Sequence, residues 1–148
     1  MKIIVDIDKT IKPDEIIIRC KEENDLVRKI KEYGDCLNNV NLCFYKREQE
    51  YYFDINEILF FETYDCGISA HTANDLYYVR HKLYELEKLL PKNFIRISKS
   101  TIVNVKHIYS INKNIASSSE IEFGKSHKKV FVSRFYFKNL KERLKERS

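Results

Sequence analysis

The stretch NFIRISKSTIVNVKHIYSI, residues 93–111, places a short polar loop between two segments with the pattern of β-strands. Apolar residues alternate with polar ones before the loop and again after it, as in half-buried strands. The loop, Ser98–Thr101, carries three hydroxyl groups and one ammonium group. Proteins use such groups to bind phosphate oxygens and base edges, but the same composition also suits an ordinary solvated turn. Local composition alone leaves both interpretations open.

The composition of the chain indicates a globular protein that works in the cytoplasm. Its 148 residues are 43% hydrophobic and 33% charged, which suits one domain with a small appendage. No run approaches the ~18 apolar residues that span a bilayer, and the first residues, MKIIVDIDKT, do not resemble a signal peptide. The four cysteines form no CxxC motif, so we expect reduced thiols, and we predict neither a metal site nor another cofactor.

The positive charge is concentrated in the second part of the chain. Residues 1–90 contain 13 Lys and Arg against 18 Asp and Glu, a net charge of −5. Residues 91–148 contain 14 against 4, a net charge of +10. Such a division predicts that one part of the protein faces a polyanion.

Residues 1–40 have the pattern of a small ββα element. Alternating apolar residues predict one strand near residues 3–7, and Glu15–Cys20 predicts a second. A helix then follows a capping residue, Asn24 or Asp25, and Gly34 marks where that helix could fray. An element of this size cannot bury a useful core alone, so it must pack on the rest of the chain or on a second copy.

Residues 41–148 read mainly as short strands. A polar loop at 46–50 separates two strands, a helical turn is predicted at 54–57, and the buried strand ILFFET occupies 58–63. A hairpin around 73–75 and a helix at 80–90 come next. Strands at 108–112, 120–123 and 130–132 then precede a final helix at 134–147. Arg134, Lys138, Lys141 and Lys145 share one face of that helix, which either contacts a polyanion or is simply solvated.

Three of these segments together resemble the LytTR (LytR/AlgR-type) DNA-binding family. FIRISKSTIVNVKHIYSI is similar to the family pattern F-x-R-x-H-[RNK]-S-[FY]-[LIV]-V-N. ILFFET resembles an early strand of the domain, and VFVSRFYFKNLKERL resembles its last strand, Ser-Arg junction and terminal helix. The resemblance covers residues 41–147, and the three motifs occur in the family's order.

The resemblance implies a mostly β (α+β overall) fold. It implies an elongated stack of short antiparallel sheets, with one helix after the fourth or fifth strand and another at the C-terminus, preceded here by the ββα element. It also implies contacts to successive major grooves of double-stranded DNA from loops and a strand-to-helix junction. The candidate contact residues are Ser69 and His71 in the hairpin region, Ser98, Lys99 and Ser100 in the central loop, Lys128 and Lys129 in the basic turn, and Arg134 and Lys138 in the last helix.

Among these residues we expect Lys99 and Arg134 to reach base edges, and the other basic and hydroxyl groups to hold phosphates. Three features depart from the family pattern: Ser98 replaces a histidine, Thr101 replaces an aromatic residue, and the junction residue that could read DNA is either Arg134 or the non-polar Phe135. Asn104 matches the family asparagine, and we predict that it shapes the turn and does not read DNA.

The resemblance also bears on partners. The family tends to bind paired direct repeats, which implies a homodimer on DNA, and stand-alone members are sometimes controlled by a membrane protein. Residues 1–40 are then a candidate dimerisation or regulatory element. The alternatives are a single-stranded RNA-binding or protein-interaction β module, since aromatic residues make up 13% of the chain. The chain shows none of the common catalytic fingerprints, so we predict no enzymatic activity and no small-molecule substrate.

Overall fold

The computed structural model describes residues 4–10, 16–38, 42–65, 67–114 and 118–147. The chain divides into two compact units, Met1–Cys36 and Leu37–Ser148, and each is described here by itself. Within the described residues, no helix is both long enough and apolar enough to cross a lipid bilayer.

The first unit contains the predicted helix. Helix α1, Asp25–Asn38, begins after Asn24, whose Oδ1 accepts a hydrogen bond of 3.0 Å from the backbone N–H of Val27. This bond satisfies one of the amides that lack partners at a helix N-terminus. The helix continues past Gly34, so this glycine does not end it.

The two strands predicted for the first unit are not formed, which corrects that part of the fold prediction. Residues 4–8 and 16–20 have no regular secondary structure, and the turn predicted at Lys12–Asp14 lies outside the described residues. Their aliphatic side chains are exposed: Ile7 is 83% and Ile16 is 88% accessible. The apolar pattern of these residues is typical of strands, but the described residues of this unit provide no surface that would bury their side chains.

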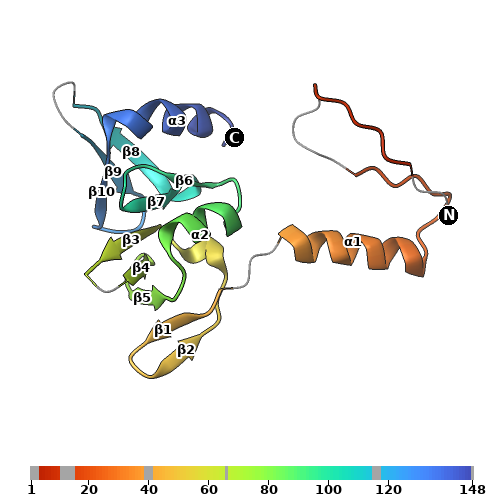
Figure 1. Ribbon diagram of the computed structural model, residues 1–148, viewed down its shortest axis with the longest axis horizontal. Helices are drawn as coiled ribbons and strands as arrows, with labels where there is room; N and C mark the ends of the chain where they lie inside the picture. Colours follow the sequence, from red (N-terminus) through yellow and green to blue (C-terminus); the bar gives the residue numbers. More distant parts are fainter. Residues whose placement is uncertain (1–3, 11–15, 39–41, 66, 115–117, 148) are drawn as a thin grey trace. The chain divides into compact units, whose positions relative to one another are not determined.

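The second unit contains two antiparallel sheets and two helices (Figure 1). The seven-stranded sheet has the order β2-β1-β5-β4-β3-β7-β6, formed by Gln49–Tyr51, Phe44–Lys46, Leu76–Val79, Gly67–His71, Phe60–Tyr64, Thr101–Asn104 and Phe94–Arg96. The three-stranded sheet has the order β10-β9-β8, formed by Lys129–Val132, Ser119–Phe123 and Ile108–Asn112. Helix α2 is Leu83–Leu89, helix α3 is Arg134–Lys145, and the short 3-10 helices η1 and η2 are Ile55–Glu57 and Val105–His107. A helix after the fifth strand and another at the C-terminus confirm the predicted mostly β fold.

The first hairpin is tighter than the sequence suggested. β1 and β2 pair as far as Lys46 and Gln49, so a two-residue turn replaces the predicted five-residue loop. Arg47 in this turn has a φ of 59°, the left-handed conformation that two-residue hairpin turns require. The turn predicted at 54–57 is confirmed as η1, with the Asp54 carboxylate accepting a bond of 2.9 Å from the backbone N–H of Asn56.

Two hydrophobic cores hold this unit together. One lies between the seven-stranded sheet and α2, and includes the fully buried Phe44, Phe61 and Leu86. The other joins the sheet to the three-stranded sheet and α3, and includes the fully buried Ile97 and Leu140. The β1–β2 hairpin and α3 lie at opposite ends of the unit (Figure 1).

Candidate nucleic-acid interface

The central loop between β6 and β7 is held by its own backbone and by one arginine. Arg96 donates from Nε to the carbonyl oxygen of Ser98 at 3.1 Å and from Nη2 to that of Lys99 at 2.5 Å. Ser98 Oγ accepts a bond of 3.2 Å from the backbone N–H of Ser100. The Lys99 side chain is exposed above this framework. The loop therefore presents an ammonium group from a fixed backbone.

The start of α3 lies against the same loop. The backbone N–H of Ser133 donates to the carbonyl oxygen of Ile97 at 2.9 Å, so the β10–α3 junction is joined to the residue before the loop. Ser133 occupies the N-cap position without a hydrogen bond from its side chain. Arg134 and Phe135 follow it, both exposed, and the Phe135 side chain is 82% accessible. An arginine and a solvated aromatic ring thus adjoin the central loop.

The β3–β4 hairpin reaches the loop from the other side. The backbone N–H of Thr63 donates to the carbonyl oxygen of Ser100 at 2.9 Å. The turn of this hairpin follows at once, between Tyr64 and Gly67. Backbone hydrogen bonds therefore bring three segments, distant in sequence, to one end of the two sheets: the hairpin turn, the central loop and the strand-to-helix junction. These three segments are called the contact surface below.

Helix α3 adds positive charge next to the contact surface. The predicted cationic face is exposed at all four of its positions, Arg134, Lys138, Lys141 and Lys145. Lys138 lies one turn beyond Arg134, so it is the next cation along the helix from the junction. The opposite face is apolar, with Leu140 fully buried.

The structure does not bring Lys128 and Lys129 to the contact surface. Both lie at the start of β10, and β10 extends for four residues, roughly 13 Å at ~3.3 Å per residue, before the junction. Lys128 Nζ donates to the carbonyl oxygens of Thr72 at 3.0 Å and Asp75 at 2.6 Å, and partial burial lowers the pKa of its ammonium group. Lys128 therefore stabilises the β4–β5 turn.

Lys129 is paired with carboxylates at the same distal end. Its Nζ lies 2.9 Å from Glu120 Oε1 and 3.7 Å from Glu122 Oε1 on the neighbouring strand β9. These two carboxylates offset the charge that Lys129 could offer to a polyanion.

Ser69 and His71 do not offer their side chains to the contact surface. Ser69 is buried, and its Oγ donates to the carbonyl oxygen of Glu62 at 3.0 Å. His71 ends β4, at the far end from the hairpin turn, and its ring stacks on Phe60 with centroids 4.2 Å apart. Burial, assisted by the charge of Lys128, lowers the pKa of His71 to about 4, so its imidazole is neutral at pH 7.

Asn104 has the structural role that was predicted. It is fully buried, its Nδ2 donates to the carbonyl oxygen of Ile58 at 3.0 Å, and its Oδ1 accepts from Asn93 Nδ2 at 2.9 Å and from the backbone N–H of Lys106 at 3.1 Å. These bonds join three segments and cap η2.

Two features of the surface were missed from the sequence. The first is the pairing of Tyr64 and Tyr78, whose ring centroids lie 5.0 Å apart although 14 positions separate them in sequence. The second is Arg80, whose guanidinium lies 4.3 Å from the centre of the Tyr45 ring. No local pattern signals either contact, because both depend on strand register.

Comparisons with known proteins agree with this geometry. A model of the LytTr DNA-binding domain matches residues 48–145. The chain is 32% identical over 130 residues to an uncharacterized HTH-type transcriptional regulator of Staphylococcus aureus strain NCTC 8325 / PS 47, covering 87% of this chain and 88% of that protein. It is 33% identical over 132 residues to one from the bovine strain RF122 / ET3-1, with the same coverage.

A solved structure is also similar. The LytTr DNA-binding domain of a Bacillus cereus protein assigned as a methyl-accepting/DNA response regulator superposes with a TM-score of 0.64 and 25% identity, covering 70% of this chain and 95% of that domain. In the described part of the present chain, strands separate each α-helix from the next, so no helix-turn-helix is formed there. The family match, the relatives and the fold agree, and the chain belongs to the LytTR family of DNA-binding domains.

Proposed function

We propose that this protein is a transcription regulator that binds double-stranded DNA in a sequence-specific way through the contact surface. The observation that carries the proposal is the joining of three family motifs at one end of the sheets by the Thr63–Ser100 and Ser133–Ile97 backbone bonds. The relatives named above are described as transcriptional regulators, which agrees with this function. DNA-binding regulators of this kind are not normally enzymes.

Each exposed group of the contact surface fits a role on DNA. Lys99 and Arg134 carry donors that can pair with guanine O6 and N7 in the major groove. Phe135 is the exposed apolar group beside Arg134, and an aromatic ring can contact a thymine methyl group. The hydroxyl groups of Ser98 and Ser100 and the ammonium group of Lys138 suit phosphate oxygens.

The contact residues proposed here are fewer than those predicted from sequence. Ser69, His71 and Lys128 are left out because Ser69 Oγ, His71 Nε2 and Lys128 Nζ bond within the fold, and Lys129 because two carboxylates neutralise it. The set retained is Ser98, Lys99, Ser100, Arg134 and Lys138, together with Phe135, the alternative junction residue.

Selection of binding sites from random duplex DNA, followed by titration of variants on the selected site, tests the proposal. Arg134→Ala should weaken binding about 10- to 200-fold, or about 1–3 kcal/mol, and relax the base preference at one position. Lys99→Ala should do the same at another position. Lys106→Ala is the matched control, because Lys106 is exposed beyond the distal end of β7 and should change little.

Two results would contradict the proposal. One is that the random pool yields no preferred duplex, or that single-stranded RNA competes better than the selected duplex. The other is that Lys99→Ala and Arg134→Ala both leave the affinity for the selected duplex unchanged, which would reject the contact residues.

We further propose that residues 1–40 pair two copies of the chain on DNA with directly repeated sites. The support is the exposure of aliphatic side chains at residues 4–7 and 16–18, which have the apolar composition of strands but no strand partner in the described residues of this unit. Strand pairing with a second copy would bury them. A regulatory membrane protein could bind the same exposed residues. We infer a cytoplasmic location from the proposed function, and cell fractionation would test it.

Deletion of residues 1–38 tests whether this segment pairs two copies of the chain on DNA or serves only the fold. The shortened chain should lose cooperative binding to a duplex with two sites and keep its affinity for a single site. Sedimentation of the intact chain off DNA would give its oligomeric state. Equal loss of affinity for one site and for two would show that the segment serves folding and not dimerisation.

A further inference from the structure

We propose that Arg47, Arg80 and Lys82 form a second phosphate-binding surface, which extends the DNA contact past the β3–β4 hairpin turn. These three residues, together with the tyrosines beside them, are called the flanking surface below. The inference rests on the proposed function, because it concerns the backbone of the same duplex that the contact surface binds.

The strand register connects the two surfaces in one line. Thr101, at the end of the central loop, lies opposite Glu62 on β3, and Glu62 lies opposite Ser69 on β4. Ser69 then lies opposite Tyr78 on β5, and Tyr78 opposite Tyr45 on β1. Directly opposite residues share one face of a sheet. From β4 to β1 there are two strand spacings of about 4.8 Å, so the row extends roughly 10 Å beyond the hairpin.

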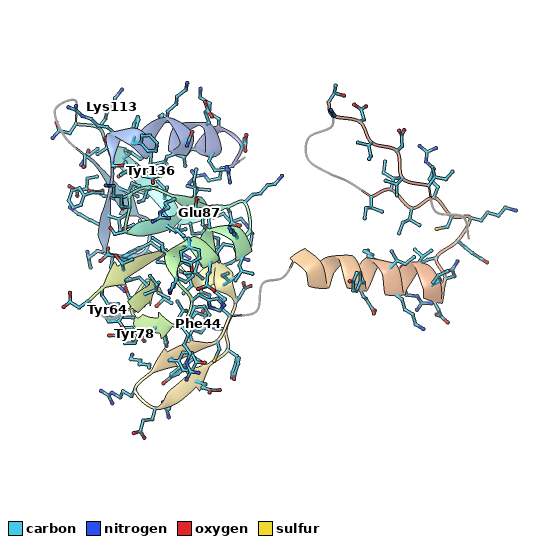
Figure 2. The ribbon with its side chains drawn as sticks, in the orientation of Figure 1. Phe44, Tyr64, Tyr78, Glu87, Lys113 and Tyr136 are labelled. Carbon is cyan, nitrogen blue, oxygen red and sulfur yellow. The ribbon has the colours of Figure 1, made fainter. Side chains whose placement is uncertain are left out.

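Aromatic rings support the cationic groups at the end of this row. The rings of Tyr64 and Tyr78 lie together at the ends of β3 and β5 (Figure 2), and both side chains are partly exposed. Arg80 follows Tyr78 by two positions, and its guanidinium stacks over Tyr45. Stacking on a ring limits the motion of an arginine and leaves its N–H groups free to bind an anion.

The groups surround a hollow of about 810 Å³ whose lining combines basic and aromatic residues with aliphatic ones. Arg47, Arg80 and Lys82 line it with His81, Tyr45, Tyr64 and Tyr78, and among the residues that the structure describes no Asp or Glu lines it. The acidic residues adjacent in sequence to lining residues are Glu48, Glu62 and Asp65.

The three cations are available for a partner. Each is exposed, and in the part of the chain that the structure describes none of them forms an ion pair. Other cations of this unit are engaged instead: Lys46 is bonded to the Asp75 carboxylate, and Lys128 donates to backbone carbonyls. An unpaired cluster of this kind next to a DNA-binding surface favours phosphate as its ligand.

The dimensions fit a duplex. The junction, the central loop and the hairpin turn follow one another across the sheet, so they define a direction for the DNA, and the flanking surface continues it. Phosphates of one strand recur every ~3.4 Å along the helix axis, so about 10 Å corresponds to about three base pairs. Arginine guanidinium groups bind phosphate oxygens through two parallel N–H donors. The footprint should therefore extend about three base pairs beyond the bases contacted by the hairpin turn.

Salt titration of binding to the selected duplex tests the inference with the full chain. The neutral variant Arg80→Gln/Lys82→Gln should lower the slope of log affinity against log salt by about 1.8, or about 0.9 for each phosphate that the variant no longer neutralises. Adding Arg47→Asn should lower it by about 2.7 in total, and asparagine tolerates the positive φ at this position. The base preference should stay unchanged, because phosphate contacts carry no direct sequence information.

Two controls make the comparison specific. Lys106→Gln/Lys125→Gln removes two exposed charges from the distal end of the sheets and should leave the slope nearly unchanged. Shortening the duplex by about three base pairs on the hairpin side should weaken binding by the native chain and leave the Arg80→Gln/Lys82→Gln variant unaffected. Circular dichroism should show that all variants are folded.

The outcomes separate this inference from the proposed function. Suppose that binding depends on Lys99 and Arg134, but that the salt slope is the same in the native chain and in the triple variant. This result would overturn the flanking surface and leave the proposed function intact. An equal decrease of the slope in the distal control would also overturn it, since the effect would then be one of net charge. If the native chain selects no duplex, both proposals fail.

Discussion

Replacement of Asn104 by alanine should destabilise the fold without removing a DNA contact. The side chain is fully buried and makes three hydrogen bonds, to Ile58, Asn93 and Lys106. Alanine leaves the carbonyl oxygen of Ile58 buried without this donor, and removes the acceptor for the other two groups. An unsatisfied buried polar group costs about 1–3 kcal/mol. Asn93 and Lys106 are partly solvated and can turn to water, so we expect a total of about 2–4 kcal/mol.

Urea unfolding followed by far-ultraviolet circular dichroism measures this destabilisation directly. The midpoint should fall and the slope should stay the same, because the surface exposed on unfolding does not change. Asn104→Asp should cost at least as much at pH 7, since it keeps the shape but puts a carboxylate oxygen where Nδ2 faces the Ile58 carbonyl. Asn112→Ala is the matched control, because Asn112 is exposed on β8 and should change stability by less than about 0.5 kcal/mol.

Binding assays separate this role from DNA reading. Well below its melting temperature, the Asn104→Ala protein that remains folded should keep the base preference of the native chain. An unchanged urea midpoint combined with an altered base preference would show that Asn104 reads DNA, and would refute the reasoning from its hydrogen bonds.

Three further predictions follow from side chains that support the surface. Arg96→Ala should weaken binding to the selected duplex about tenfold, or ~1.4 kcal/mol, because the central loop loses the guanidinium that holds two of its carbonyl groups; unchanged affinity would show that the loop keeps its shape unaided. Lys128→Met should lower the free energy of unfolding by about 1–3 kcal/mol and leave the salt slope of binding unchanged; a lower slope would restore Lys128 as a phosphate contact. His71 has a folded pKa of about 4, below the ordinary value of 6.5, so the unfolded chain binds a proton that the folded chain excludes between these values. Stability should therefore fall as the pH falls from 7 to 4, by about 2 kcal/mol more in the native chain than in His71→Phe, after a discount for its partial exposure; equal pH dependence in the two proteins would assign the effect to other groups.

The sequence by itself determined the strands of the second unit, the final helix and the family. These features are local: alternation of apolar residues, a helix with an apolar face, and three short motifs in a recognisable order. The same information predicted Lys99 and Arg134 as candidate DNA contacts, because the motifs that contain them are continuous in sequence.

Only the tertiary structure decided which cations are available. Lys128, Lys129 and Lys138 look equivalent in sequence, yet Lys128 bonds to the β4–β5 turn, Lys129 lies between two carboxylates, and Lys138 is exposed beside the junction. The difference arises from partners that are distant in sequence. Charge counting shows that a segment is basic, but it cannot show which of the charged groups are already bonded to other groups within the fold.

Strand register decided which side chains meet in the flanking surface. The pairing of β1 with β5 puts Tyr45 under Arg80 and brings Arg47 near Tyr78, although these residues come from segments more than 30 positions apart. Conversely, the apolar residues at 4–7 and 16–18 predicted strands that the described residues of the first unit do not form. A strand requires a neighbour to satisfy its backbone and bury its side chains, and a local pattern cannot supply that neighbour.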